Sequence, residues 1–174
     1  TLGGVLMNPV FPAEIILALL VLDAQVLVVD SHQAETRIPI ETFVSDARPQ
    51  LPNGSLVSGV AVPLKDHQTG VLERVARTKS DTSIVSVVVT AERVQNEWHN
   101  LKIAIFGASS LPKRYHAAET VIGSRALTEE SIDQCVQRIP EETQAICDYR
   151  GSADYRQAMS GVLTRRALLS LMQS

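Results

Sequence analysis

Two adjacent glycines near the start of the chain are the residues best suited to contact a ligand. They stand in the run Thr1-Leu2-Gly3-Gly4, shortly before a segment in which apolar residues recur at helical spacing. Glycines let backbone N–H groups approach a phosphate closely, and the N-terminus of a helix favours an anion. The run therefore predicts an anion-binding turn. A plain tight turn is the alternative, because no lysine follows the glycines.

The other reactive side chains show no catalytic or metal-binding pattern. The four histidines lack the spacing of a zinc motif, and no GxSxG elbow indicates a hydrolytic triad. Cys135 and Cys147 cannot form a CxxC pair, and Cys135 is expected to face the core. His116 is expected at the start of a helix, on the surface. We therefore assign no catalytic residue and no metal ligand.

The first part of the chain must position the glycines. Apolar residues at helical spacing predict a helix over residues 12–22, with a proline tolerated in its first turn. Glu14 falls in that first turn, where a carboxylate complements the helix dipole. Strands are predicted over residues 25–29, 36–40 and 56–62, with a turn over 50–55.

The second part of the chain predicts a small α+β domain over residues 72–174, after a polar linker at 63–71. A strand at 72–76 precedes a β-branched run at 82–93, which is expected to form an antiparallel hairpin with 98–106. Helices are then predicted over 117–122, 128–138 and 152–172, and we expect Pro140 to stop the second of them. Strands followed by helices indicate the α+β class, here an antiparallel sheet with about three helices.

Three arginines of the last predicted helix form a basic edge, namely Arg156, Arg165 and Arg166. Such an edge is either a solvated face or a surface on which a partner docks. The sequence leaves both alternatives open.

Composition excludes several classes of protein. The chain has 174 residues, of which 45% are hydrophobic, and a net charge of −3, which argue against disorder and against a nucleic-acid-binding surface. Residues 10–29 reach the length of a membrane span, but they include Glu14 and Asp23, which are costly in a bilayer. Two cysteines are too few for a disulfide scaffold. We expect a soluble, cytoplasmic protein that binds neither nucleic acid nor membrane.

Motifs at both ends of the chain resemble one known family. The run Thr1-Leu2-Gly3-Gly4, together with residues 18–24 (ALLVLDA), resembles the T-[IL]-G-G-N and A-L-L-A-L-D-A motifs of the FAD-binding (medium) subunits of molybdenum hydroxylases. Residues 148–156 (DYRGSADYR) and 162–168 (VLTRRAL) are similar to the motifs that close the same subunits. This family includes xanthine dehydrogenase, aldehyde oxidoreductase and aerobic carbon monoxide dehydrogenase.

The resemblance implies a fold and a function. Residues 1–62 would be the latter part of an FAD-binding domain, and residues 72–174 the C-terminal domain of such flavoproteins. Substrate would be oxidised at molybdopterin in a large partner subunit. Electrons would pass through the 2Fe-2S clusters of a small subunit to FAD, and from FAD to an acceptor. The chain would then hold and tune the cofactor rather than supply a catalytic side chain.

The same resemblance implies cofactor-binding residues. Thr1, Gly3 and Gly4 would lie against the phosphates of FAD, and Glu14 stands where the family has aspartate. Two further departures would weaken binding: Val5 replaces an asparagine, and Glu73 stands at a position where some relatives carry lysine.

The family's N-terminal subdomain, with an A-G-G-T phosphate loop, is missing from the 174 residues. We therefore expect an N-terminally truncated flavoprotein subunit that alone binds FAD weakly or not at all and is inactive. The alternative is a flavin-free assembly module derived from the family. The substrate and the electron acceptor stay open.

Overall fold

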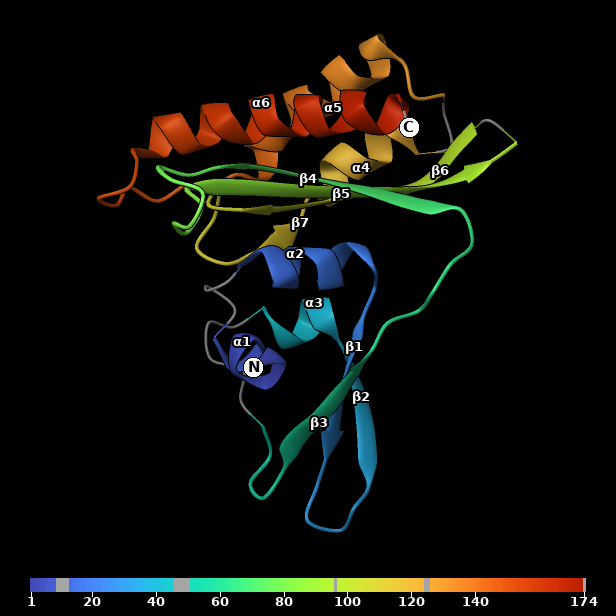
Figure 1. The fold of residues 1–174 in the computed structure, drawn as a ribbon, viewed down its shortest axis with the longest axis vertical. Helices are drawn as coiled ribbons and strands as arrows, with labels where there is room; N and C mark the ends of the chain where they lie inside the picture. Colours follow the sequence, from blue (N-terminus) through green and yellow to red (C-terminus); the bar gives the residue numbers. More distant parts are fainter. Residues whose placement is uncertain (9–12, 46–50, 96, 124–125, 174) are drawn as a thin grey trace.

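The computed structural model describes residues 1–8, 13–45, 51–95, 97–123 and 126–173. Within these residues, two antiparallel sheets and two groups of helices are stacked along the long axis of the molecule (Figure 1). This arrangement confirms the α+β class that the sequence predicts.

The N-terminal part combines short helices with a three-stranded sheet of order β2-β1-β3. Its elements are α1 (Leu2–Met7), α2 (Ala13–Val21), β1 (Gln25–Val29), β2 (Glu35–Pro39), α3 (Ile40–Phe43) and β3 (Leu56–Ala61). The predicted helix and strands are confirmed to within about a residue at most ends, except that Ile40 begins α3 instead of ending a strand. Pro12 and Gln50, where a helix and a turn are predicted to start, lie outside the described residues.

The second sheet has the order β4-β5-β6-β7, with strands β4 (Gln68–Val75), β5 (Val85–Val94), β6 (Glu97–Phe106) and β7 (Lys113–Arg114). The predicted hairpin is confirmed as β5 and β6, which pair antiparallel with Val89 opposite Ile103. Strand β4 begins earlier than expected. Residues 68–71, predicted as the end of a linker, therefore pair with the second half of β5.

Three helices follow in the described part of the chain, namely α4 (His116–Ile122), α5 (Glu129–Glu142) and α6 (Ala153–Met172). Thr128 caps α5 as predicted, because its hydroxyl accepts the Ser131 N–H at 3.2 Å. The expectation that Pro140 stops this helix is wrong, since α5 continues to Glu142. A proline inside a helix removes one backbone hydrogen bond, and α5 ends two residues after Pro140.

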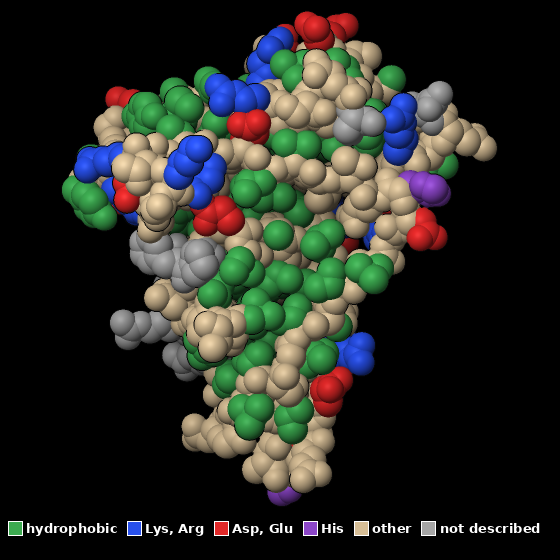
Figure 2. Space-filling view, viewed as in Figure 1, with side chains coloured by type: hydrophobic (Ala, Val, Ile, Leu, Met, Phe, Trp, Pro, Cys, Tyr) green, Lys and Arg blue, Asp and Glu red, His purple; other side chains and the backbone are tan. Residues whose placement is uncertain are grey.

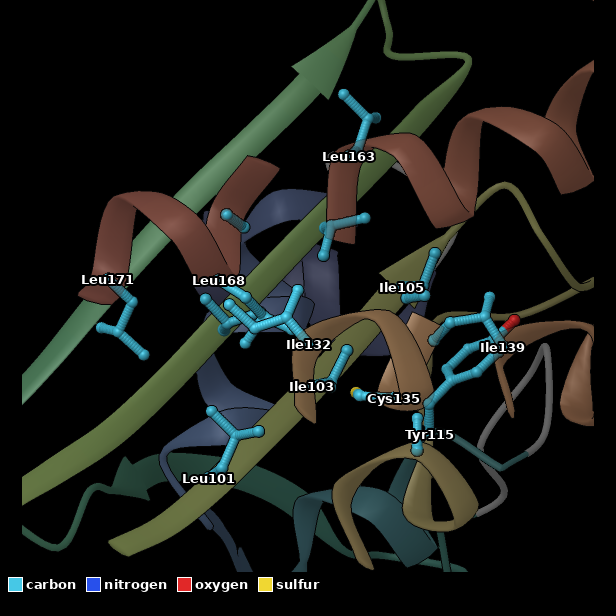
Figure 3. Close-up of a cluster of buried hydrophobic side chains, with 14 of the residues drawn as sticks. Leu101, Ile103, Ile105, Tyr115, Ile132, Cys135, Ile139, Leu163, Leu168 and Leu171 are labelled. Atoms are coloured by element: carbon cyan, nitrogen blue, oxygen red, sulfur yellow. The ribbon is translucent and has the colours of Figure 1, made fainter. Parts of the chain in front are cut away.

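The β4–β7 sheet is covered on both faces, and this arrangement joins the two parts of the chain. Helices α4, α5 and α6 pack on one face, and α2 packs on β5 and β6 from the other (Figure 1). The helix-covered face is a closed apolar core (Figure 3), whose buried members include Val87, Val89, Ile103, Ile105, Leu163 and Leu168. On the opposite face, Val88, Ala104 and Phe106 join the core of the N-terminal part. The run of β-branched residues in β5 lacks polar alternation because both faces of this strand are buried.

Within the described residues, no helix has the length and apolarity needed to cross a bilayer.

Candidate cofactor site

The run of two glycines forms the first turn of helix α1. Thr1 is the N-cap, and its hydroxyl oxygen accepts the N–H of Gly4 at 3.2 Å. The expectation of a turn ahead of a helix is therefore wrong in one respect, because Gly3 and Gly4 are themselves helical. In the described part of the chain, the N–H groups of Leu2 and Gly3 meet no acceptor, as is usual at the start of a helix.

The surroundings of the two glycines differ. Among the described residues, a Cβ at Gly3 would meet no atom within 4 Å, and Gly3 itself is exposed. A Cβ at Gly4 would lie 3.3 Å from the Thr1 hydroxyl oxygen and would press on the cap. Gly4 therefore protects the geometry of the cap, while Gly3 leaves room for a ligand. Both features fit a phosphate group held by backbone N–H groups.

Glu14 lies in the first turn of α2, as predicted, and its carboxylate is turned toward the β4–β7 sheet. Its Oε1 accepts hydrogen bonds from the hydroxyls of Ser83 at 2.8 Å and Ser86 at 3.0 Å. Arg74 Nε lies 3.7 Å from the same oxygen. Burial raises the pKa of Glu14, but hydrogen bonds from its backbone and the two serines, with the charge of Arg74, lower it below the ordinary value. The carboxylate is therefore ionised at neutral pH.

A groove of about 320 Å³ runs between α2 and the sheet, beside Glu14. Its lining is mainly apolar and comes from α2, β4 and β5: Glu14, Ala18, Val21, Leu22, Gln68, Thr69, Gly70, Val71, Leu72, Val88 and Thr90. Figure 2 shows hydrophobic side chains gathered in the middle of the molecule, between the β4–β7 sheet above and the N-terminal sheet below. The groove thus offers an apolar slot with an ionised carboxylate in its wall, which suits a flat, largely apolar ring with polar edges.

The residues predicted to weaken cofactor binding do not face this groove. Val5 is 8% exposed and packs in the N-terminal core, so its side chain contributes to packing. Glu73 pairs with Arg166 at 3.5 Å, on the side of β4 that contacts α6. The next residue, Arg74, is the one that contacts Glu14. Glu73 therefore faces away from the groove, because successive side chains of a strand point to opposite faces.

The predicted basic edge of α6 is only partly on the surface. Arg165 and Arg166 are exposed, whereas Arg156 is 1% exposed. The guanidinium of Arg156 donates to the Ile84 carbonyl at 2.7 Å and to Asp148 at 2.5 Å. Arg156 is therefore an internal anchor and is unavailable to a docking partner.

The remaining reactive side chains lie as the sequence suggests. Cys135 is fully buried, and burial, with a smaller effect of Glu119, raises the pKa of its thiol to about 12. His116 begins α4 with a half-exposed side chain that contacts Glu41 at 2.7 Å. No cluster of metal-binding side chains occurs within the residues that the structure describes.

Sequence reasoning missed Ser83, Ser86, Arg74 and the groove-lining part of β4. Ser86 gave a signal, since it interrupts a run of β-branched residues that otherwise predicts a fully apolar strand. The contact with Glu14 could not be foreseen because 72 positions separate the two residues.

Comparison with known proteins identifies the family. Residues 71–171 match the profile of the CO dehydrogenase flavoprotein C-terminal domain, and residues 1–65 match that of the FAD binding domain in molybdopterin dehydrogenase. The chain belongs to the FAD-binding medium subunits of the molybdenum hydroxylase family. The resemblance inferred from the terminal motifs is thereby confirmed.

Individual medium subunits are similar over nearly the whole chain. The glyceraldehyde dehydrogenase medium chain of Sulfolobus acidocaldarius is 23% identical over 96% of this chain, and the nicotine 6-hydroxylase medium subunit of Paenarthrobacter nicotinovorans is 27% identical over 97%. A solved carbon monoxide dehydrogenase from Hydrogenophaga pseudoflava has the same fold, with a TM-score of 0.88 and 20% identity over 97% of this chain. The chain spans 59% of the length of each of these three proteins.

Proposed function

We propose that this medium-subunit chain holds FAD between the N-terminus of α1 and the groove beside Glu14. The observation that carries the proposal is an apolar slot whose wall contains an ionised carboxylate, in a chain that also has two open backbone N–H groups at the start of α1. The slot suits the ring system of FAD, and the N–H groups suit its pyrophosphate. Helix α1 and most of the groove lining lie in segments that match flavoprotein domain profiles.

Each site residue then has a role. Leu2 and Gly3 donate their backbone N–H groups to the phosphates. Thr1 uses its hydroxyl oxygen to cap Gly4 and retains its O–H proton for an anion. Glu14 accepts a hydrogen bond from an N–H or O–H group of the cofactor. Bound FAD would supply one- and two-electron transfer, and these residues would bind and orient it without acting as acids or bases.

We further propose that the protein relays electrons as one subunit of a cytoplasmic complex. A large subunit with molybdopterin would oxidise the substrate, and 2Fe-2S clusters in a small subunit would deliver the electrons to FAD and then to an acceptor. Two of the relatives are named as a medium chain and a medium subunit, which supports an assembly of several subunits. In this role the chain binds the cofactor and supplies no catalytic side chain of its own.

Titration of the 174-residue chain with FAD tests cofactor binding. We expect saturable but weak quenching of flavin fluorescence, because the described residues supply one helix N-terminus and one groove. The variant Gly3→Asp should lower FAD affinity about tenfold, since a carboxylate at the open position repels phosphate. An aspartate in the first turn favours the helix, so the fold should persist.

Riboflavin, which lacks phosphates, is the matched control ligand. Its affinity should be equal for wild type and Gly3→Asp if the variant acts through phosphate repulsion. Undetectable FAD binding by the wild type, or an unchanged FAD affinity in the variant, would overturn the assignment of the phosphate site to α1.

A further inference from the structure

The contacts of Glu14 continue through the sheet to the C-terminal motif. Ser83, whose hydroxyl donates to Glu14, lies just before β5 and is fully buried. On the helix-covered side, Arg150 Nη1 donates to the Ser83 carbonyl at 3.4 Å, and Arg156 Nη1 donates to the carbonyl of Ile84 at 2.7 Å. Two arginines therefore hold the backbone that presents the Ser83 hydroxyl to Glu14.

Asp148 fixes both of these arginines. It accepts Arg150 Nε at 3.0 Å and Nη2 at 2.7 Å, and its other oxygen accepts Arg156 Nη2 at 2.5 Å. A forked contact of this kind sets both the position and the orientation of a guanidinium. The segment 148–156, which identifies the family in sequence, thus reaches the wall of the groove through a chain of hydrogen bonds.

We propose that Ser83, Ser86 and Arg74 are positioning residues that fix the Glu14 carboxylate as a hydrogen-bond acceptor for the flavin. This inference rests on the proposed binding of FAD in the groove. Arg74 is the charged side chain that contacts Glu14 within the described residues, and the two serines are its side-chain hydrogen-bond donors. Segment 148–156 supports the arrangement by holding Ser83.

A purely structural role is the alternative, in which the same bonds only tie α2 to the sheet. Two observations favour positioning. The Glu14 side chain is 22% exposed and lines the groove, so a ligand in the groove can reach it. The other end of α2 is already tied to β5, since the Thr90 hydroxyl donates to the Val21 carbonyl at 3.2 Å. A neutral hydroxyl suffices for that tie, whereas two hydroxyl donors and the charge of Arg74 converge on one oxygen of Glu14.

The pH dependence of FAD binding distinguishes the two roles. The wild-type chain should bind FAD equally from about pH 8 down to pH 5, because Glu14 stays ionised throughout. In the double variant Ser83→Ala/Ser86→Ala, the pKa of Glu14 should rise, so that affinity falls as pH drops toward 5. At neutral pH the double variant should bind about three- to tenfold more weakly. Glu14→Gln should bind weakly with no pH dependence, and Ser83→Thr should retain wild-type behaviour.

Ser160→Ala serves as the matched control, because this buried hydroxyl donates only to the Gln157 carbonyl within α6. Carbon-13 NMR titration of the Glu14 carboxyl in the ligand-free chain provides a readout independent of flavin. It should give a higher pKa in the double variant than in wild type. If the double variant fails to fold, the same two measurements on Ser86→Ala and on Arg74→Met replace it.

The outcomes separate this inference from the proposed function. A wild-type chain without saturable FAD binding overturns the proposed function and, with it, the ligand role of Glu14. A wild-type chain that binds FAD, with a double variant that matches it in affinity, pH profile and Glu14 pKa, overturns the inference alone.

Discussion

The two faces of the β4–β7 sheet differ in how completely they are covered. On the face toward α4, α5 and α6, the side chains of Val87, Val89, Ile103 and Ile105 are fully buried among apolar neighbours. On the face toward α2, the same strands present Ser86 and Thr90, and part of the surface is the open groove. One sheet therefore has a closed apolar face and a second face that α2 covers only in part, with buried hydroxyls that bond to α2.

The difference suggests how the fold divides its tasks. Burial of apolar side chains on the helix-covered face supplies stability, at about 25 cal/mol per Å² of apolar surface removed from water. On the other face, α2 covers enough of the sheet to join the two parts of the chain and leaves a slot with an ionised wall residue. Substitutions on the closed face should therefore alter unfolding, and those at the groove should alter ligand binding.

The largest expected effect is at the anchor that supports the closed face. Arg156→Met removes a buried guanidinium that bonds the Ile84 carbonyl and Asp148. Loss of one partner from a buried ion pair typically costs about 3–5 kcal/mol. We expect a reduction of this size in the free energy of unfolding, measured by urea denaturation followed by circular dichroism. Arg165→Met, on the same helix but exposed and paired with Asp133, should cost less than about 1 kcal/mol. Equal losses in the two variants would show that Arg156 is no anchor.

A cavity in the closed core should have the next largest effect. Ile103 is fully buried, and Figure 3 shows its side chain beneath the helices. Ile103→Ala should lower the free energy of unfolding by about 3 kcal/mol, within the usual range for core isoleucines. Thermal denaturation checks the result, and Ile15→Ala on the exposed side of α2 is the control, since Ile15 is 42% exposed. A loss below about 1 kcal/mol would mean that the helix-covered face is less tightly packed than the structure indicates.

Acid should destabilise the protein through Asp148. Burial opposes ionisation of this carboxyl, but hydrogen bonds from Arg150 and Arg156 hold its pKa well below the ordinary range. A pKa that is lower in the folded state gives stability above the unfolded pKa of about 3.9, and that stability is lost as pH falls further. We expect a loss of about 1–2 kcal/mol between pH 6 and pH 3 that is absent from Asp148→Asn. Urea denaturation at both pH values gives the comparison. The control Asp133→Asn should keep the wild-type pH dependence.

Local patterns explain why most elements could be predicted. The β-branched run of β5 and the alternation in β6 identify a hairpin, and Thr128 marks the start of α5. These signals act over a few residues, so the sequence alone displays them. The sequence predicts a turn at the start of α1 because glycines favour turns, whereas the Thr1 cap and the core contacts of Val5 and Leu6 support a helix there.

The candidate site could be predicted only in part. The glycine run and Glu14 follow from the resemblance to the family, and the structure provides a chemical setting for both. The partners of Glu14 lie about 70 positions away, on a sheet whose contact with α2 no local pattern specifies. The orientation of β4 is a second feature that the sequence does not specify. A shift of one residue in its register would place Glu73 beside the groove instead of Arg74.

The smallest effect on stability should come from Leu72→Ala. Its comparison with Ile103→Ala sets the groove face of the β4–β7 sheet directly against the helix-covered face. Leu72 is 49% exposed and lines the groove, so Leu72→Ala creates no internal cavity. Its free energy of unfolding should stay within about 0.5 kcal/mol of wild type. Its affinity for FAD should fall about three- to tenfold, because the apolar surface that Leu72 presents to the ring is lost. Leu64→Ala removes a leucine that is 94% exposed and outside the groove, and it should change neither quantity. If Leu72→Ala destabilised the chain as much as Ile103→Ala, the groove face would share the structural task of the closed core. If it left both quantities unchanged, the groove would not be where the ring binds.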